Sequence, residues 1–255
     1  MPVHEVAQQG FDSGADAYER ARPSYPPDAV AWLVENCAIR QGATVCDLAA
    51  GTGKLTRLLT PTGANLLAVE PVEGMSQHLR ELLPSVPVAA STAEAMPFAD
   101  GSLDAVTVAQ AFHWFDAERA FAELARVLRP GGRVGLIWNA RDRSVPWVDK
   151  IWGVLDRVEK RAPWRDHERW SDTDLGARAG FGPLHTGTFH HEQPLSPEGV
   201  VERFESVSHV AVLPPDERAK VLDEMRTVLA TDPGSAGRDE LAIPYRVDAY
   251  WSERL

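Results

Sequence analysis

Two spacings of hydrophobic positions alternate along the first 140 residues. Short apolar runs, typical of buried strands, are followed by stretches in which apolar residues recur every three or four positions, as on one face of a helix. The expected strands cover 44–48, 66–69, 103–109 and 134–138, with a weaker run at 86–90, and the expected helices cover 27–39, 54–59, 73–83 and 117–128. Strands that alternate with helices predict an α/β fold with a parallel, doubly wound sheet.

The pattern is less regular after Asn139. Two later segments alternate like strands, 184–191 and 241–251, and two repeat like helices, 196–207 and 215–230. With the late strands included, we expect a mostly parallel, seven-stranded sheet and a partly helical cap. The expected parts are an N-terminal arm and core over 1–140, a cap that includes a late strand over 141–240, and a closing strand of the core sheet over 241–255.

Composition limits the classes of partner. The chain has 255 residues, of which 44% are hydrophobic and 25% charged, as in soluble globular proteins with a sizeable core. Its formal net charge of −11 opposes contact with a phosphate backbone, so no nucleic-acid partner is expected. With two cysteines, no signal sequence and no apolar run long enough to span a membrane, we expect a cytoplasmic protein without a disulfide, a metal site or a membrane partner.

A glycine-containing turn follows the first expected strand. Asp47 lies in that strand, Gly51 and Gly53 follow it, and the second strand leads into Glu70. Glycine permits backbone conformations and close approaches that other residues prevent. An acidic residue at the end of the second strand can accept hydrogen bonds from both hydroxyls of a ribose. These residues predict a site for a nucleotide-type cofactor.

The residues around the turn distinguish three kinds of cofactor. A Walker phosphate loop requires Ser or Thr after Gly-Lys, but Leu55 follows Lys54, so the Lys54 side chain is expected to be solvated. A dinucleotide fingerprint requires a third glycine where this chain has Thr56. Asp47 would repel a pyrophosphate and attract the ammonium group of a cofactor that carries an amino acid. The turn favours this third kind.

Five motifs between residues 40 and 140 resemble, in the same order, those of the class I S-adenosylmethionine-dependent methyltransferases. They are 47–53, 70–71, 91–98, 103–106 and 128–132. Ala49 replaces the usual first glycine of the turn, and Thr92 stands where aspartate is common. The resemblance implies a Rossmann-like fold, S-adenosyl-L-methionine as the cofactor and a small molecule as the methyl acceptor.

The resemblance also implies which residues contact the cofactor. Glu70 would bind the ribose, Met75 would pack on the adenine, and the Thr92–Ala93 segment would meet the adenine edge. Ala49 is tolerated in the turn only if its φ stays negative. The expected cofactor-binding residues are Tyr18, Arg22, Asp47, Ala49, Gly51, Gly53, Glu70, Pro71, Met75, Thr92, Ala93, Glu94 and Gln110.

A narrower resemblance, to the trans-aconitate-type branch of the type 11 methyltransferases, rests on residues 18–26 and 109–115. The second segment follows the fourth expected strand, at the sheet edge where ligands bind in such folds. His113 is the candidate catalytic base in this segment, and the alternative is a structural histidine that hydrogen-bonds the loop. Trp147 and Trp152 either wall an acceptor cavity or attach the cap to the sheet.

The expected reaction is in-line transfer of a methyl group to an oxygen of a small molecule, either a hydroxyl or a carboxylate, driven mainly by proximity. For a carboxylate acceptor, His113 is not needed as a base, and Arg22 or Arg141 can orient the acid. The alternatives are a nitrogen or carbon acceptor, a nicotinamide-dependent oxidoreductase and a non-catalytic cofactor-binding module. The chain is expected to be a monomer or a homodimer.

Overall fold

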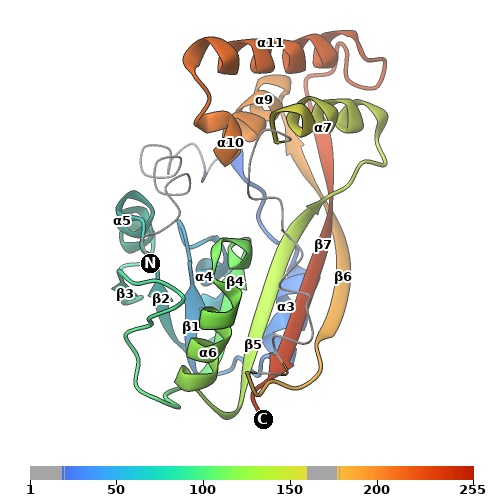
Figure 1. Ribbon diagram of the computed structural model, residues 1–255. Helices are drawn as coiled ribbons and strands as arrows, with labels where there is room; N and C mark the ends of the chain where they lie inside the picture. Colours follow the sequence, from blue (N-terminus) through green and yellow to red (C-terminus); the bar gives the residue numbers. More distant parts are fainter. Residues whose placement is uncertain (1–18, 20, 160–176, 178) are drawn as a thin grey trace.

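The computed structural model describes residue 19, residues 21–159, residue 177 and residues 179–255. They contain a seven-stranded sheet in the order β3-β2-β1-β4-β5-β7-β6, in which β7 is antiparallel to both neighbours and the other pairs are parallel (Figure 1). The strands are β1 (Thr44–Leu48), β2 (Asn65–Val69), β3 (Val88–Ala89), β4 (Leu103–Ala109), β5 (Leu128–Arg141), β6 (His185–Leu195) and β7 (Leu241–Glu253). This confirms the predicted mostly parallel α/β sheet.

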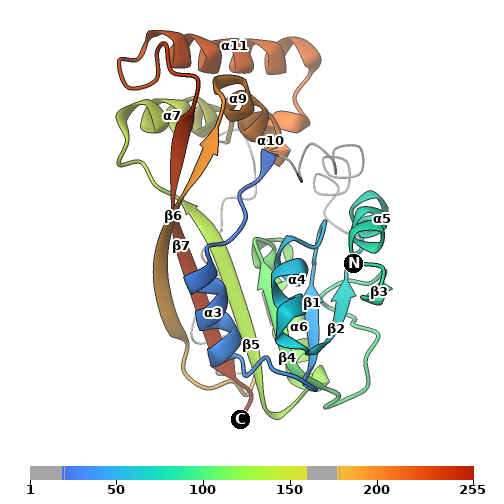
Figure 2. The ribbon, with the colours of Figure 1, turned by 180° about the vertical axis from the view of Figure 1, so that it is seen from behind.

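Helices cover both faces of this sheet. Those of the core are α3 (Pro27–Asn36), α4 (Lys54–Leu59), α5 (Glu73–Leu82) and α6 (Ala117–Val127), with the short 3-10 helices η1 (Thr60–Thr62) and η2 (Phe112–Trp114). Leu33, Leu59 and Leu79 of the first three helices belong to one apolar cluster, whereas Phe121 and Leu124 of α6 belong to another. Figures 1 and 2 show α6 on one face and α3 on the opposite face.

The central strand β1 lies between β2 and β4. Val45 pairs with Leu66 on one side and with Ala105 on the other, and four of the five residues of β1 are buried. A short apolar run of this kind forms a strand because it can be covered on both faces. The strand order reverses at β1, so the carboxyl ends of β1 and β4 form the edge at which ligands bind in doubly wound sheets.

Four of the described helices form a cap beyond this edge (Figure 1). They are α7 (Pro146–Glu159), α9 (Pro197–Glu205), α10 (Ser208–Ala211) and α11 (Pro215–Thr231). Trp147 and Trp152 of α7 are 4% and 3% exposed and belong to a third apolar cluster that includes Phe204. The two tryptophans therefore pack inside the cap. β6 and β7 extend into the cap, where Leu195 pairs with Leu241.

The start of β5 differs from the sequence prediction, which begins this strand at residue 134. β5 already begins at Leu128 and runs through the segment 129–132. The amide of Gly131 donates to the carbonyl of Arg254, and the amide of Arg254 donates to the carbonyl of Gly132, both at 2.8 Å. These bonds to the end of the chain keep the segment in the sheet. Within the described ranges, no helix combines the length and the hydropathy required to cross a bilayer.

Candidate active site

The turn between β1 and α4 uses left-handed backbone at three positions. φ is 53° at Ala49, 59° at Gly51 and 83° at Gly53. The expectation of a negative φ at Ala49 is therefore wrong. The chain reverses directly after β1 to begin α4, and it does so through a conformation that costs about 1–2 kcal/mol for a residue with a Cβ.

Ala49→Gly should stabilise the protein because glycine adopts this conformation without the steric cost. The greater entropy of glycine in the unfolded chain offsets part of the gain, so the expected net increase in the free energy of unfolding is about 0.5–1 kcal/mol. Denaturant titration measures this change. Ala50→Gly is the matched control in the same turn, since φ of Ala50 is not positive. A stabilisation of equal size in both variants would contradict the assignment of strain to Ala49.

Gly51 and Gly53 have different surroundings. A Cβ on Gly53 would lie 3.0 Å from Cγ of Leu79, so the close packing of the turn against α5 requires glycine there. A Cβ on Gly51 would have no atom of the described chain within 4 Å beyond its own neighbours in sequence. The backbone of Gly51 therefore borders open space, where a ligand can approach it.

A cavity lies beside this turn, with walls from the core and the cap. Gln110, directly after β4, also has a positive φ of 57°. Two of the three described non-glycine residues with positive φ, Ala49 and Gln110, therefore line the same cavity. Backbone strain concentrated in one place is a mark of functional sites. The lining residues are Arg22, Pro23, Tyr25, Ala49, Ala50, Gly51, Thr52, Lys54, Leu55, Ala109, Gln110, Asn139 and Arg203.

Glu19 attaches the N-terminal arm to the turn. Its carboxylate accepts hydrogen bonds from Thr52 Oγ1 (2.6 Å) and Arg57 Nη2 (2.8 Å), and its carbonyl accepts one from Lys54 Nζ (2.6 Å). Burial alone would raise the pKa of Glu19, but the hydrogen bonds and the two positive charges outweigh it and lower the pKa. The prediction of a solvated Lys54 is wrong, because its side chain is 13% exposed and pairs with Glu19.

Residues 21 and 22 of the arm are hydrogen-bonded to the cap and to β6. Arg22 donates from Nε to the Ser206 hydroxyl (3.0 Å) and from Nη2 to the Ser206 carbonyl (2.7 Å). Gln193 Nε2 donates to the Ala21 carbonyl at 3.0 Å. These bonds hold Arg22 at the cavity wall. Tyr18, expected to bind the cofactor, lies outside the described residues.

Asp47 lies beneath the turn and does not line the cavity. Its Oδ2 accepts a hydrogen bond from the Thr56 hydroxyl (2.5 Å) and its Oδ1 accepts one from the Thr107 hydroxyl (2.9 Å), and all three residues are buried. Burial raises the pKa of Asp47 to about 6 against the lowering effect of these hydrogen bonds. The carboxylate thus connects β1 to α4 and β4. Its attraction for an ammonium group stays a prediction.

Glu70 follows β2 and is 5% exposed. Its Oε2 accepts a hydrogen bond from the Gly51 amide and its Oε1 accepts one from the Val72 amide, each at 2.8 Å. Burial raises the pKa of Glu70 to about 7 against the lowering effect of these bonds, and the charge of Asp47 adds to the rise. Each carboxylate oxygen has a second lone pair, so both can still accept a ribose hydroxyl.

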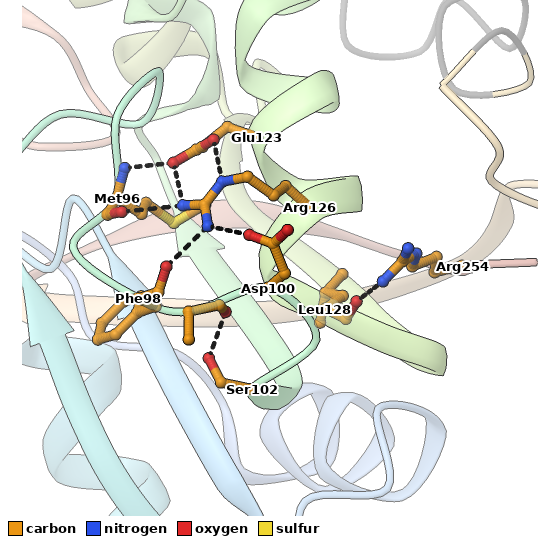
Figure 3. Close-up of polar contacts among 9 residues, drawn as sticks. Met96, Phe98, Asp100, Ser102, Glu123, Arg126, Leu128 and Arg254 are labelled. Carbon is orange, nitrogen blue, oxygen red and sulfur yellow. Dashed lines mark hydrogen bonds and ion pairs between the residues drawn. The ribbon is translucent and has the colours of Figure 1, made fainter.

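Arg126 of α6 holds the loop between β3 and β4. Figure 3 shows its guanidinium donating to the carbonyls of Phe98 (2.8 Å) and Met96 (3.1 Å) and to the carboxylates of Asp100 (2.7 Å) and Glu123 (2.6 Å). Glu123 also accepts a hydrogen bond from the Met96 amide at 2.7 Å. The sequence analysis missed this network, which fixes the loop that carries Thr92, Ala93 and Glu94.

The remaining expected cofactor residues lie around the turn without lining the cavity. Met75 and Ala93 are each 3% exposed. Glu94 accepts a hydrogen bond from the Asp116 amide at 3.0 Å, which joins the loop to the start of α6. Thr92 and Pro71 are half-buried. The adenine contacts assigned to these positions stay predictions.

His113 lies on η2, half-buried, with its ring centroid 5.0 Å from that of Trp114. His113 does not line the cavity, whereas Gln110 of the same loop does. Arg141 is also outside the cavity wall, since it pairs with Asp156 at 3.1 Å and lies over the Trp152 ring. The catalytic role of His113 therefore stays a prediction.

Arg203 of α9 lines the cavity and was missed by the sequence analysis. A signal was present: Val200, Phe204 and Val207 form the apolar face of the expected helix 196–207, and Arg203 falls on that face. A single charged residue on an otherwise buried helix face indicates a polar site within the fold.

Comparisons with known proteins agree with this geometry. A family model described as a methyltransferase domain matches residues 46–136. An uncharacterized methyltransferase of Mycobacterium tuberculosis is 41% identical over 235 residues, which are 92% of this chain and 91% of the relative. An uncharacterized methyltransferase-like protein of Schizosaccharomyces pombe is 35% identical over 253 residues, or 99% and 98% of the two chains.

A solved structure from Anaeromyxobacter dehalogenans, assigned as a type II methyltransferase, superposes with a TM-score of 0.66 at 25% identity over 91% of this chain and 96% of that one. The relatives extend over the cap as well as the core. The match to methyltransferases rules against the alternative that the chain is a nicotinamide-dependent oxidoreductase. With its glycine turn after β1 and its buried acid after β2, the chain belongs to the class I S-adenosylmethionine-dependent methyltransferases, and S-adenosyl-L-methionine is its cofactor.

Proposed function

We propose that the methyl acceptor is an oxygen of a small molecule, and that a carboxylate suits the site better than a hydroxyl. One observation carries the proposal: the cavity wall contains Arg22 and Arg203, and none of its described residues is Asp, Glu or His. A hydroxyl would need a base to take its proton, and a cationic amine would be repelled by the guanidinium groups. A carboxylate is already ionised at neutral pH. The trans-aconitate-type resemblance points to the same acceptor.

The residues of the turn fit the cofactor. The two carboxylate oxygens of Glu70 keep lone pairs for the ribose hydroxyls, and the backbone of Gly51 borders open space that the methionine part can fill. When bound, the cofactor supplies a methyl group activated by its sulfonium. Glu70 and the turn would then hold the donor at the cavity wall opposite the cap.

The chain would accelerate the reaction by alignment and by excluding water. Arg22 and Ala21 are hydrogen-bonded to Ser206 and Gln193, which attaches the described end of the arm beside the cavity. The cap, over 141–240, would contribute the far wall and the acceptor contacts.

His113→Ala should leave substantial turnover, with kcat within about tenfold of the wild type. A residue that removes a proton in the transition state contributes about a hundredfold or more, and an ionised acceptor requires no such step. Steady-state release of S-adenosylhomocysteine measures the effect. A loss of about a hundredfold, together with the disappearance of an ionisation near neutral pH from the kcat profile, would assign His113 as the base.

An acceptor panel of carboxylates, alcohols, phenols and amines tests the proposed function directly. The expected products are methyl esters, identified by mass and by their hydrolysis in base, with one S-adenosylhomocysteine released per ester. Turnover confined to amines or alcohols would refute the carboxylate assignment. Cofactor binding without turnover on any acceptor would instead support a non-catalytic module.

We also propose a reduced, cytoplasmic setting for a monomer or homodimer. Cys37 and Cys46 are free and buried. Burial raises the pKa of Cys37 to about 12 and that of Cys46 well above its usual range, so neither forms a reactive thiolate at neutral pH.

A further inference from the structure

Arg203 is a buried cation with an unused donor. The residue is 5% exposed, and its Nη1 atom is buried without a hydrogen-bond partner in the described chain. It also lines the cavity that Ala49 and Gly51 line from the opposite wall. The free-energy cost of a buried charged donor without a partner exceeds the contribution of an ordinary hydrogen bond. Such an atom therefore indicates that a ligand pairs with it.

The Nε atom and the ring contacts of Arg203 fix the position of the guanidinium. Nε of Arg203 donates to the Tyr245 hydroxyl at 2.9 Å, and that hydroxyl donates to Gln193 Oε1 at 3.3 Å. The guanidinium carbon lies 5.8 Å from the Tyr245 ring centroid, 6.0 Å from that of Trp152 and 5.6 Å from that of Phe204. No described carboxylate forms an ion pair with Arg203. The arginine is therefore positioned by rings and one hydroxyl, while no carboxylate among the described residues neutralises its charge.

The surroundings of Arg203 are positive in a chain of net charge −11. Arg22 lines the same cavity. It also contacts the end of the helix that carries Arg203: Arg22 donates to the Ser206 hydroxyl, and that hydroxyl donates to the Arg203 carbonyl at 2.7 Å. His209 adds no charge, since burial and the nearby charges of Arg141 and Arg22 lower its pKa to about 4. Two fixed guanidinium groups in a shared, enclosed space favour an anion.

We propose that Nη1 of Arg203 binds a carboxylate of the acceptor and thereby selects acidic acceptors. This inference rests on the proposed function and adds the residue that determines specificity. The cofactor also carries a carboxylate, so Arg203 could bind either the carboxylate of the acceptor or that of the cofactor. The acceptor is the source we assign, because Arg203 belongs to the cap whereas the turn and Glu70 belong to the core. Arg22, on the arm, is among the residues expected to contact the cofactor, and it is also a candidate to orient an acceptor acid.

The test uses the full-length protein saturated with S-adenosylhomocysteine. Succinate and its uncharged counterpart succinamide are titrated by calorimetry into the wild type, Arg203→Met and Arg203→Lys. Methionine keeps the apolar volume inside the cap and removes the guanidinium. Arg226→Met is the matched control: it removes the same charge from α11 of the cap, where the side chain is 45% exposed and pairs with Glu198.

We expect succinate, and not succinamide, to bind the wild type and the Arg226→Met control. Arg203→Met should weaken succinate binding by at least about tenfold, with the lysine variant in between, while S-adenosylhomocysteine affinity changes by less than about threefold. If Arg203→Met does not fold, Tyr245→Phe takes its place, since it removes the hydroxyl that orients Arg203 and keeps the ring.

Three outcomes would overturn the inference. A loss of S-adenosylhomocysteine affinity with succinate binding unchanged would assign Arg203 to the cofactor carboxylate. Equal succinate binding by all variants would make Arg203 a structural residue. No succinate binding by the wild type would remove the carboxylate ligand that the inference requires and would count against a carboxylate acceptor. Failure of the wild type to bind S-adenosylhomocysteine at all would instead count against the proposed function.

Discussion

Glu70→Gln should weaken S-adenosylhomocysteine binding by at least about a hundredfold at pH 8, because two charge-assisted hydrogen bonds to the ribose are lost. The wild-type affinity should itself fall about tenfold from pH 8 to pH 6, since the pKa of about 7 requires the carboxyl to lose a proton before it accepts both hydroxyls. Calorimetric titration at both pH values measures the two effects.

Glu73→Gln is the control for this variant, because Glu73 is a nearby carboxylate on α5 whose side chain is 72% exposed. It should bind like the wild type and keep the same pH dependence. The Glu70 variant should show no pH dependence over this range. A Glu70→Gln protein that binds within about threefold of the wild type would show that Glu70 serves the turn, through Gly51 and Val72, and not the ribose.

Asp47→Ala should lower the free energy of unfolding by about 2–4 kcal/mol, because the buried hydroxyls of Thr56 and Thr107 lose their acceptor. Asp47→Asn keeps one acceptor oxygen and should lose less than half as much. The native pKa of about 6 exceeds the ordinary 3.8, so the stabilising contribution of this carboxyl is present at low pH and is lost as the pH rises through about 6.

The stability of the Asp47→Asn variant relative to the wild type should therefore rise between about pH 4 and pH 7, because the unfolded carboxyl loses its proton near pH 3.8 whereas the buried native one keeps it up to about pH 6. Denaturant titrations at both ends of this range measure the difference. An Asp47→Ala protein as stable as the wild type would mean that the two threonines find other partners and that Asp47 does not connect β1 to its neighbours.

The sequence predicted the strands of the core well because their burial is uniform. The expected bounds of β1 and β4 agree with the structure, and each is a short apolar run between polar turns. α7 was not predicted, because the hydrophobic pattern is irregular after Asn139 and its tryptophans were expected only to wall a cavity or to attach the cap to the sheet. They form one side of a cap core whose partners, α9 and α11, come more than 40 residues later in the chain.

The parts of the site that the sequence misjudged depend on contacts between distant segments. Lysine side chains are usually exposed, but that of Lys54 is largely covered because it pairs with Glu19, which lies 35 residues earlier in the chain. Ala49 has a residue type that disfavours positive φ, but the required reversal after β1 overrides that preference. The sequence marks Arg203 as a lone charge on an apolar helix face, but its place in the cavity wall depends on the packing of α9, which lies about 150 residues after the turn.

A crystal structure with S-adenosylhomocysteine tests the central claim most directly. We expect both ribose hydroxyls within hydrogen-bond distance of the Glu70 carboxylate, the methionine part against the Gly51 backbone, and the sulfur facing a cavity bordered by Arg22 and Arg203. A ribose bound away from Glu70, or a sulfur separated from that cavity by the turn, would contradict this claim.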